Sequence, residues 1–275
     1  MKKLFSFLMC LGLMGLAFAF SGCGGVDLYM YIYAGEYKRI TSSTSFEEEI
    51  KDLEINWLAG ELKVIAGDVD KITLTETGEK VEDKPGYYRL TNDGHLDIEY
   101  FKSGEVRDPK IIKNLTITIP RSYNFMGIDI NTTHGNVYLD GVVSNTIKLI
   151  HTNGNSLVKN STFEMAKVIT KVGFSNITNS VVQEDLILNP NEGKVEVTSC
   201  NVKDYIVYTY KGEITLTMPD ESFALTIDPA STGRCNHEDF EIVDGVYGDR
   251  ENILHTISFS STHSSAVLNL VKLVV

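Results

Sequence analysis

Three small groups of side chains carry atoms that metal binding or acid–base catalysis could use. The segment 235–239, Cys-Asn-His-Glu-Asp, combines a thiol, an imidazole and two carboxylates, which are common zinc ligands. His134 and His151 offer two further imidazoles, and Glu184 with Asp185 is the densest acid pair. A zinc site needs three or four ligands, and glycoside cleavage needs two carboxylates facing one substrate. No group is complete within its own segment, so we predict no metal site, no cofactor and no catalytic residue, and we interpret the acid pair as a solvated turn.

The segments that would position these groups repeat with a nearly fixed period. Glycine recurs at an almost constant spacing, at Gly135, Gly154, Gly173, Gly193 and Gly212. A constant period of this length is typical of stacked repeats, in which each period is one supersecondary unit. The sequence therefore predicts a series of coils that stack on one another.

Apolar residues keep constant distances from these glycines. The fourth residue after each glycine is aliphatic without exception: Leu139, Val158, Ile177, Val197 and Leu216. The fourteenth residue gives a second aliphatic set: Leu149, Val168, Ile187 and Val207. Around the first set, small or apolar residues alternate with more polar ones, which is the two-residue period of a β-strand. We therefore expect at least two short strands in each coil, with equivalent positions stacked.

A stacked β-coil protein can carry a carbohydrate-cleaving site. Equivalent positions of neighbouring coils lie about 4.8 Å apart, so a single column of acids would bring carboxylates together. We find no such column in the repeats. The fifth residue after each glycine, for example, is in turn Asp140, Lys159, Thr178, Thr198 and Thr217. The sequence therefore argues against a carbohydrate-active enzyme, which stays an alternative interpretation.

The flanking segments follow the same pattern less regularly. Residues 46–77 contain a strand, then Gly60, then a second alternating strand. Residues 78–113 interrupt the rhythm with a hairpin expected within 87–101, because its centre reads Asn-Asp-Gly, a strong turn signal. The apolar strands within 253–275 are expected to form the closing coil, since a solenoid must cover its open ends.

Of the four cysteines, Cys10 and Cys23 lie near the N-terminus, which leaves Cys200 and Cys235 in the rest of the chain. An exported pair of cysteines can form a disulfide. We prefer two unpaired thiols, because Cys200 occupies a column of small interior residues, seven positions after each glycine. The other members of that column in the first three coils are Val142, Ser161 and Ser180.

The N-terminus has the pattern of an export signal. Two lysines at positions 2 and 3 precede the apolar run Leu4–Phe20, and Ser21-Gly22-Cys23 ends it. This ending resembles the lipobox of bacterial lipoproteins, with phenylalanine at position 20 where leucine is usual. The resemblance implies a signal peptide over 1–22 and lipidation of Cys23, in an exported, membrane-anchored lipoprotein at the bacterial cell surface or envelope. A secreted form and an uncleaved anchor are the alternatives.

The remaining chain divides into a lipid-anchored tether over 23–45 and one domain over 46–275. Removing 1–22 leaves 23 basic and 37 acidic side chains, a net charge of −14. An acidic surface repels nucleic acid, so we expect no nucleic-acid partner. The expected partners are the membrane, through the lipid anchor, and an unknown protein or glycan.

The series of coils is entered by Ile117-Thr118-Ile119-Pro120 and left by Leu216-Thr217-Met218-Pro219. In this succession the chain resembles the bacterial putative-adhesin family of exported β-strand-repeat domains, over residues 46–275. The resemblance implies an all-β, single-stranded right-handed β-solenoid, β-helix-like with one glycine period per coil, or a solenoid-like sandwich. It implies no biochemical activity, because the family has none assigned and no catalytic motif.

We interpret the protein as a non-catalytic surface lipoprotein, an adhesin or binding scaffold. Tyr138, Leu157 and Phe174 are expected to point outward from adjacent coils, and they are the candidate partner surface. An envelope scaffold or a sensor domain is a further alternative.

Overall fold

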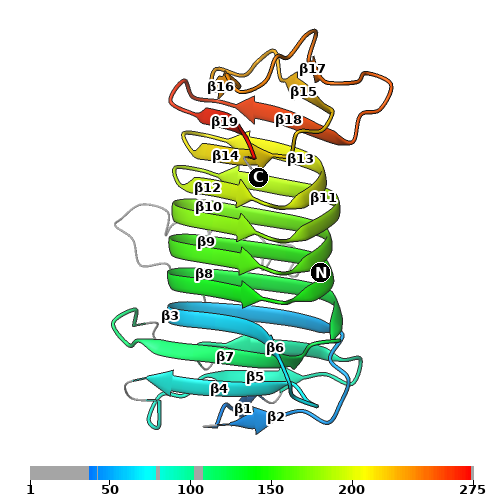
Figure 1. Ribbon diagram of the computed structural model, residues 1–275. Coiled ribbons are helices and arrows are strands. Elements are labelled where there is room, and N and C mark those ends of the chain that lie inside the picture. The colour runs from blue at the N-terminus through cyan, green and yellow to red at the C-terminus, as the bar shows by residue number, and fades with distance from the viewer. Residues whose placement is uncertain (1–36, 42, 79–80, 102–107, 274–275) are drawn as a thin grey trace, which may run out of the picture. The chain divides into compact units, whose positions relative to one another are not determined.

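A computed structural model describes residues 37–41, 43–78, 81–101 and 108–273. The predicted signal peptide, Cys23 and most of the predicted tether lie outside these residues. The elements of the described residues are all β-strands, so none is a helix long and apolar enough to cross a membrane. Nineteen strands in this part of the chain wind as a right-handed β-solenoid, as the resemblance implied (Figure 1).

The central coils follow the predicted period. Three 17-residue strands each run almost the whole way round one coil: β8 (Asn124–Asp140), β9 (Val143–Lys159) and β10 (Thr162–Thr178). The next two coils hold two strands each: β11 (Val181–Pro190) and β12 (Lys194–Thr198), then β13 (Asn201–Thr209) and β14 (Glu213–Met218). At least two strands per coil is therefore right for the later coils. In the earlier ones a single strand bends at its glycine.

The register of the stack is parallel and offset by one glycine period. Val143 pairs with Thr162, and Thr162 pairs in turn with Val181 on the following coil. The predicted column four residues after each glycine is buried throughout, and its member Ile177 is 3% exposed. Inward and outward side chains alternate along each strand, which confirms the two-residue period.

One predicted inward position is wrong. Ile187 points outward and is partly exposed, while its neighbour Leu188 is buried and pairs with Val168 and Val207. Val182 pairs with Val202, but the next pair is Asp185 with Asp204, so β11 holds one extra residue between these two pairs, which is a β-bulge. The longer interval from Gly173 to Gly193 marks that bulge, so counting forward from Gly173 misplaces the inward residue by one.

At the N-terminal end of the described domain, the order in which the strands stack differs from their order along the chain. β3 (Asp52–Gly67) pairs with β8 on one side, and with β6 (His95–Glu99) and β7 (Lys113–Pro120) on the other. The predicted hairpin is confirmed as β5 (Tyr87–Leu90) antiparallel to β6. The outermost strands are β4 (Thr73–Gly78), β2 (Thr44–Ser45) and β1 (Lys38–Arg39), which pair antiparallel with β7, β4 and β5.

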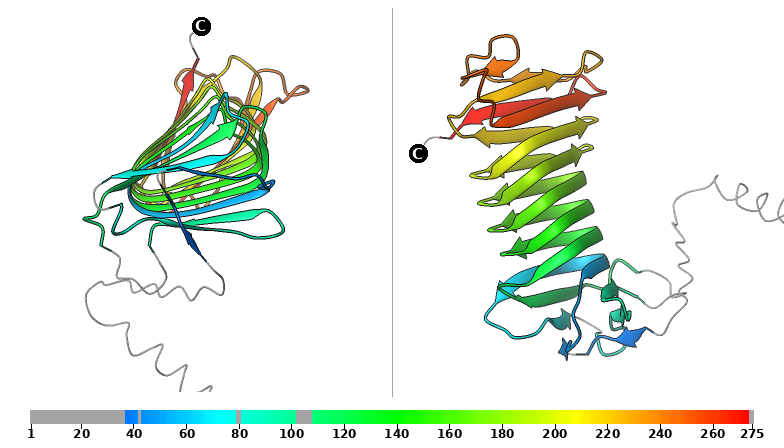
Figure 2. Two further views of the ribbon diagram at one scale, coloured as in Figure 1. Left: turned by 90° about the horizontal axis from the view of Figure 1, so that it is seen from below. Right: turned by 90° about the vertical axis from the view of Figure 1, so that its right-hand side faces the viewer.

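The same arrangement occurs at the other end. β18 (His255–Ser261) and β19 (Val267–Lys272) lie against β13 and β14 on one side. On their other side lie β15 (Phe223–Ile227) and β16 (Arg234–Asn236), with β17 (Val246–Tyr247) antiparallel to β15. The last strands are thus inserted into the stack and do not close it, which corrects the expected closing coil (Figure 2). The outermost strands at this end are β15, β16 and β17, where the rings of Phe223, Phe240 and Tyr247 pack edge to face or tilted against one another.

The corner after each coil is a ladder of side chain to backbone contacts. Ser161 Oγ accepts a hydrogen bond from the Val142 backbone N–H, and Ser180 Oγ accepts one from Ser161 N–H. Cys200 continues this column as a buried thiol, and both Cys200 and Cys235 are free. The preferred interpretation of two unpaired thiols is therefore confirmed.

Candidate functional site

Each coil presents one outward strand face before its glycine bend and one after it. Because the strands are parallel and in register, outward residues of successive coils form straight columns. We call the outward side chains of β6, β13, β18 and the strand segments before each bend of β3, β8, β9, β10 and β11 the pre-glycine face. The outward side chains after each bend are the post-glycine face.

Four isoleucines lie side by side on the pre-glycine face. Ile150 pairs with Ile169, and Ile187 pairs with Ile206. Ile187 also pairs with Lys167, two residues before Ile169, so the two pairs are diagonal neighbours. All four side chains are partly exposed, and none packs against the buried core. We call these four residues the isoleucine patch.

Two larger apolar side chains flank the patch. Met165 lies two residues before Lys167 and is 39% exposed, while Tyr208 lies two residues after Ile206 and is 52% exposed. The sequence analysis did not identify this surface. A signal was available, because Leu149-Ile150 and Val168-Ile169 are adjacent apolar residues and a strand can bury only one of two neighbours.

The predicted partner surface lies on the post-glycine face. Tyr138 and Leu157 are in register, Phe174 is diagonal to Leu157, and all three are partly exposed. Tyr138 donates a hydrogen bond to Asp140, and Lys159 lies 5.1 Å from its ring. Burial alone would raise the pKa of Asp140, but hydrogen bonds, including those from Tyr138 and Lys159, lower it. The tyrosine is thus tied to neighbouring charges, and Leu157 and Phe174 are the apolar part of this set.

The pre-glycine face also carries a column of acids. Asp97 pairs with Glu54, Glu54 with Asp129, and Asp129 with Lys148, on four neighbouring strands. The expectation that no acid column exists is therefore wrong for the whole stack, although it holds for the five repeats compared. Two of these acids come from the flanking strands β6 and β3, which a count from the five glycines does not align.

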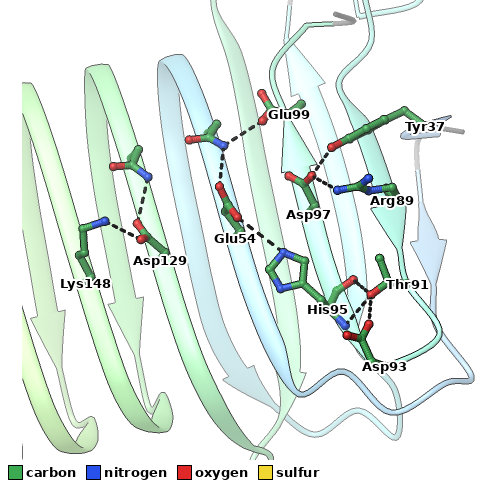
Figure 3. Close-up of polar contacts among 12 residues, drawn as sticks. Tyr37, Glu54, Arg89, Thr91, Asp93, His95, Asp97, Glu99, Asp129 and Lys148 are labelled. Carbon is green, nitrogen blue, oxygen red and sulfur yellow. Dashed lines mark hydrogen bonds and ion pairs between the residues drawn. The ribbon is translucent and has the colours of Figure 1, made fainter. Parts of the chain in front are cut away.

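Each acid of the column is held by neighbouring polar groups (Figure 3). Asn56 donates hydrogen bonds to Glu54 at 3.3 Å and to Glu99 at 2.8 Å. On the neighbouring coil, Asn131 likewise donates a hydrogen bond to Asp129 at 2.9 Å. Lys148 Nζ lies 2.6 Å from the other Asp129 oxygen. The asparagine amides therefore orient Glu54 and Asp129, Lys148 offsets the charge of Asp129, and His95 Nε2 lies 3.5 Å from Glu54.

The outer end of the column is closed by the first described residue. Tyr37 donates a hydrogen bond to Asp97, and Arg89 lies 3.2 Å from the same carboxylate oxygen. The Arg89 guanidinium is 5.1 Å from the Tyr37 ring. Burial and the neighbouring carboxylate raise the pKa of the Tyr37 phenol, so it stays protonated and keeps donating. Asp97 is consequently only 4% exposed.

A shallow groove of about 430 Å³ crosses the pre-glycine face beside this column. We call it the Gly127 groove, because Gly127 lies among its lining residues. Its other lining residues include charged and polar side chains of β3, β6, β8, β9 and β10, namely Asp52, Glu54, His95, Asp129, Lys148 and Lys167. Met165 and Ile187 line it toward the isoleucine patch.

The other predicted groups do not assemble into a site. Glu184 and Asp185 lie within strand β11 at its bulge, which corrects the expected turn, and the exposed Glu184 is ion-paired with Lys203 at 2.7 Å. His134 is exposed, whereas His151 is fully buried. Among the described residues, no three His, Cys, Asp or Glu side chains are placed to hold a metal ion, and this includes the 235–239 segment.

The buried imidazole belongs to an internal polar cluster. His151 Nε2 lies 2.8 Å from Ser175 Oγ, which also contacts Ser156 and Thr170 at 2.7 and 2.6 Å. Burial lowers the pKa of His151 to about 4, so the ring is neutral at neutral pH. Since all four side chains are buried, the cluster stabilises the bend and has no access to substrate.

A second buried polar group lies at the N-terminal end of the described domain. Lys113 is fully buried, with its Nζ 3.5 Å from Glu76 and 3.9 Å from the centre of the Tyr100 ring. Burial raises the pKa of Glu76 and outweighs the opposing hydrogen bond from Gly86 and the charge of Lys113. This pair connects β4 and β7 across the end of the core.

The chain is similar to several solved structures at low sequence identity. No curated protein matches the chain. A putative adhesin from Bacteroides fragilis is 14% identical, with 82% of this chain and 95% of that one covered and a TM-score of 0.42. A putative cell adhesion protein from Clostridium sporogenes is 14% identical, with 86% of this chain and 100% of that one covered and a TM-score of 0.35. A putative lipid-binding protein from Parabacteroides distasonis is 13% identical, with 86% of this chain and 98% of that one covered and a TM-score of 0.40.

The family comparison covers most of the described domain. The model of the family described as Toastrack DUF4097 matches residues 50–232, which run from β3 through the five regular coils to the loop after β15. The predicted resemblance to a family of β-strand-repeat domains is thereby confirmed. The chain belongs to the Toastrack DUF4097 family.

Proposed function

We propose that the protein is a non-catalytic binding scaffold of the bacterial cell surface, of the adhesin type. The observation that carries this proposal is the isoleucine patch. Four outward aliphatic side chains are contiguous on a flat sheet face, and Met165 and Tyr208 extend the apolar surface. Contiguous exposed apolar area of this kind marks interaction surfaces, because covering it removes apolar atoms from water at about 25 cal/mol per Å².

The backbone beneath the patch supports the same function. Neighbouring coils are joined along their length by parallel pairing, so the outward columns keep a fixed spacing of about 4.8 Å. A partner that matches this spacing binds without ordering a loop, which lowers the entropy cost of association. Stacked repeats present extended surfaces of this kind.

Export and anchoring are a separate part of the proposal. The lipobox-like ending places a lipid on Cys23, and the segment 24–36 would link the membrane to the first described strand. Replacing Cys23 by serine should move the protein from the membrane fraction to the soluble fraction of the producing cell. Unchanged membrane association of Cys23→Ser would contradict lipid anchoring at this residue.

A carbohydrate-active enzyme is the second candidate, and the column Asp97, Glu54 and Asp129 is what favours it. Two of its members are engaged in ion pairs, Asp97 with Arg89 and Asp129 with Lys148. An acid catalyst needs a proton that it can deliver to a substrate oxygen, and a carboxylate held in an ion pair is poorly suited to that role. Release of reducing ends from a polysaccharide would favour this candidate over the scaffold.

The binding surface can be located with paired variants. Ile169→Ser with Ile206→Ser removes outward apolar side chains from the pre-glycine face, and Leu157→Ser with Phe174→Ser does so on the post-glycine face. Both pairs should fold like the parent chain, because the altered side chains lie outside the core. We expect the first pair to lose adhesion of protein-coated beads to host-matrix proteins or cells. Loss only in the second pair would place the partner on the predicted surface around Leu157.

A further inference from the structure

The pre-glycine face repeats one polar motif on two neighbouring strands. Glu54-Ile55-Asn56 in β3 and Asp129-Ile130-Asn131 in β8 are in register, residue for residue. In both, the asparagine amide donates a hydrogen bond to the carboxylate two residues earlier. Two carboxylate–amide pairs therefore lie one strand spacing apart, about 4.8 Å, on an outward face.

The Asp129–Asn131 pair keeps unused hydrogen-bonding capacity, whereas the two N–H groups of Asn56 are already donated to Glu54 and Glu99. A carboxylate oxygen can accept two hydrogen bonds, and each Asp129 oxygen accepts one, from Asn131 or from Lys148. The Asn131 side chain makes only the bond to Asp129 among the contacts of the described residues. A group with a donor and an acceptor close together can thus donate to the carboxylate and accept from the amide. Two adjacent hydroxyl groups have this property.

The Gly127 groove leaves room for such a group beside Asp129, which lines it, and Asn131 follows two residues later on the same outward face, at the edge of the groove. A methyl group on Gly127 would stand 3.0 Å from Asp52 Oδ1 and 3.4 Å from Thr146 Oγ1, so the absence of a side chain opens the floor between them. The groove volume of about 430 Å³ is within the range of small-ligand sites. Met165 and Ile187 give its far side an apolar border, which suits the C–H surface of a sugar ring.

Charge selects among polyhydroxylated ligands. The chain has a net charge of −12, and the column Asp97, Glu54 and Asp129 adds local negative charge, so a polyanion is repelled. Lys148 and Lys167 line the same groove, so a polycation meets like charge as well. A neutral ligand avoids both costs.

We propose that the Gly127 groove binds a neutral oligosaccharide, through vicinal hydroxyl groups placed over Asp129 and Asn131 at its edge. This rests on the proposed function and names the ligand class of its pre-glycine face. Sugar hydroxyls bridge the Asp129 carboxylate and the Asn131 amide, and the ring packs against Met165. The isoleucine patch adjoins the groove and would contact whatever carries the glycan.

The proposal is tested with the mature chain by isothermal titration calorimetry. The neutral probes are cellohexaose, maltohexaose and mannohexaose at millimolar concentration, and the charged probes are polygalacturonate and polylysine. At least one neutral probe should bind. Asn131→Ala and Gly127→Ala should each weaken that binding about tenfold, the first by removing hydrogen bonds and the second by filling the floor. Asn176→Ala, on the post-glycine face, is the matched control and should leave the affinity unchanged.

Three outcomes would overturn this proposal. They are the absence of heat with all neutral probes, binding of polygalacturonate or polylysine alone, and equal affinity for the parent chain and Asn131→Ala. Adhesion lost in Ile169→Ser with Ile206→Ser but retained in Asn131→Ala would then show that the scaffold function holds without the glycan site. Melting curves of Asn131→Ala and Gly127→Ala that match the parent exclude misfolding as the cause of weaker binding.

Discussion

A Cβ atom on Gly154 would stand 1.8 Å from the carbonyl oxygen of Gly135, one coil earlier. Gly135 meets Gly60 and Gly173 meets Gly154 in the same way, at 1.9 Å in both cases. These glycines also have positive φ, between 106° and 141° for Gly60, Gly135, Gly154 and Gly173, where other residues are strained. The repeat period in the sequence is therefore a steric requirement of the bend.

Gly154→Ala should unfold or severely destabilise the central coils, because it combines a backbone clash with a strained φ. We expect a loss of at least about 3 kcal/mol in the free energy of unfolding, measured by urea denaturation. Asn179→Gly is the control, since Asn179 has a φ of 49° that glycine adopts easily, and it should change stability by less than about 1 kcal/mol. A Gly154→Ala protein as stable as the control would contradict the close stacking at the bend.

Ile177→Asp should also prevent folding of the middle of the stack. Ile177 is 3% exposed between Val158 and Val197, so an aspartate there is a charge buried among aliphatic side chains, at a cost of several kcal/mol. Thr178→Asp, one residue on, points outward beside Lys159 and should be tolerated. Circular dichroism and urea denaturation compare the two. A cooperatively folded Ile177→Asp protein would contradict the register of the coils.

His151 predicts a specific dependence of stability on pH. Its pKa is about 4 in the folded protein and about 6.5 when unfolded, so only the unfolded chain binds the proton between these values. The free energy of unfolding should therefore fall as pH drops from 6.5 to 4, by up to about 3 kcal/mol from this residue, and level off below. Other groups titrate as well, so the test is the difference between the parent chain and His151→Gln at each pH. A difference that does not change with pH would show that His151 is not buried as a neutral ring.

The ion pair of Lys113 and Glu76 predicts strong non-additivity. Lys113→Met leaves the Glu76 carboxylate in the core without its cation, and we expect a loss of about 3–5 kcal/mol. Lys113→Met combined with Glu76→Leu removes both charges and should recover most of that loss, because an apolar pair of similar volume avoids the desolvation cost. A double-mutant cycle by thermal denaturation measures this. If the separate losses of Lys113→Met and Glu76→Leu add up to the loss of the double variant, the pair carries no coupling.

The coil architecture follows from the sequence because the bends demand glycine and the core demands alternation. Both constraints act within one period, so they appear as spacings such as that from Gly154 to Val158. The order in which the strands stack at the two ends could not be predicted in this way. The insertion of β3 between β7 and β8 depends on which exposed edge a distant strand covers, and residue spacing contains no information about that choice.

The candidate site is less predictable from the sequence, for related reasons. The acid column joins Asp97, Glu54 and Asp129 across strands that are not consecutive in the chain. It can be recognised only once the stacking order of the strands is known. A fixed count from the glycine assigns Ile187 to the core, because the bulge before it shifts the alternation by one residue. Tyr138, Leu157 and Phe174 are outward neighbours as predicted, and whether they bind a partner stays a prediction.

Binding of the mature chain to an array of glycans and host-matrix proteins, with product analysis on every polysaccharide, tests the central claim most directly. The scaffold function predicts binding to at least one component, no cleavage products, and loss of that binding in Ile169→Ser with Ile206→Ser. Cleavage of any polysaccharide would contradict a non-catalytic role and point to the acid column. Binding unaffected by the isoleucine variants would contradict the assignment of the isoleucine patch as the binding surface.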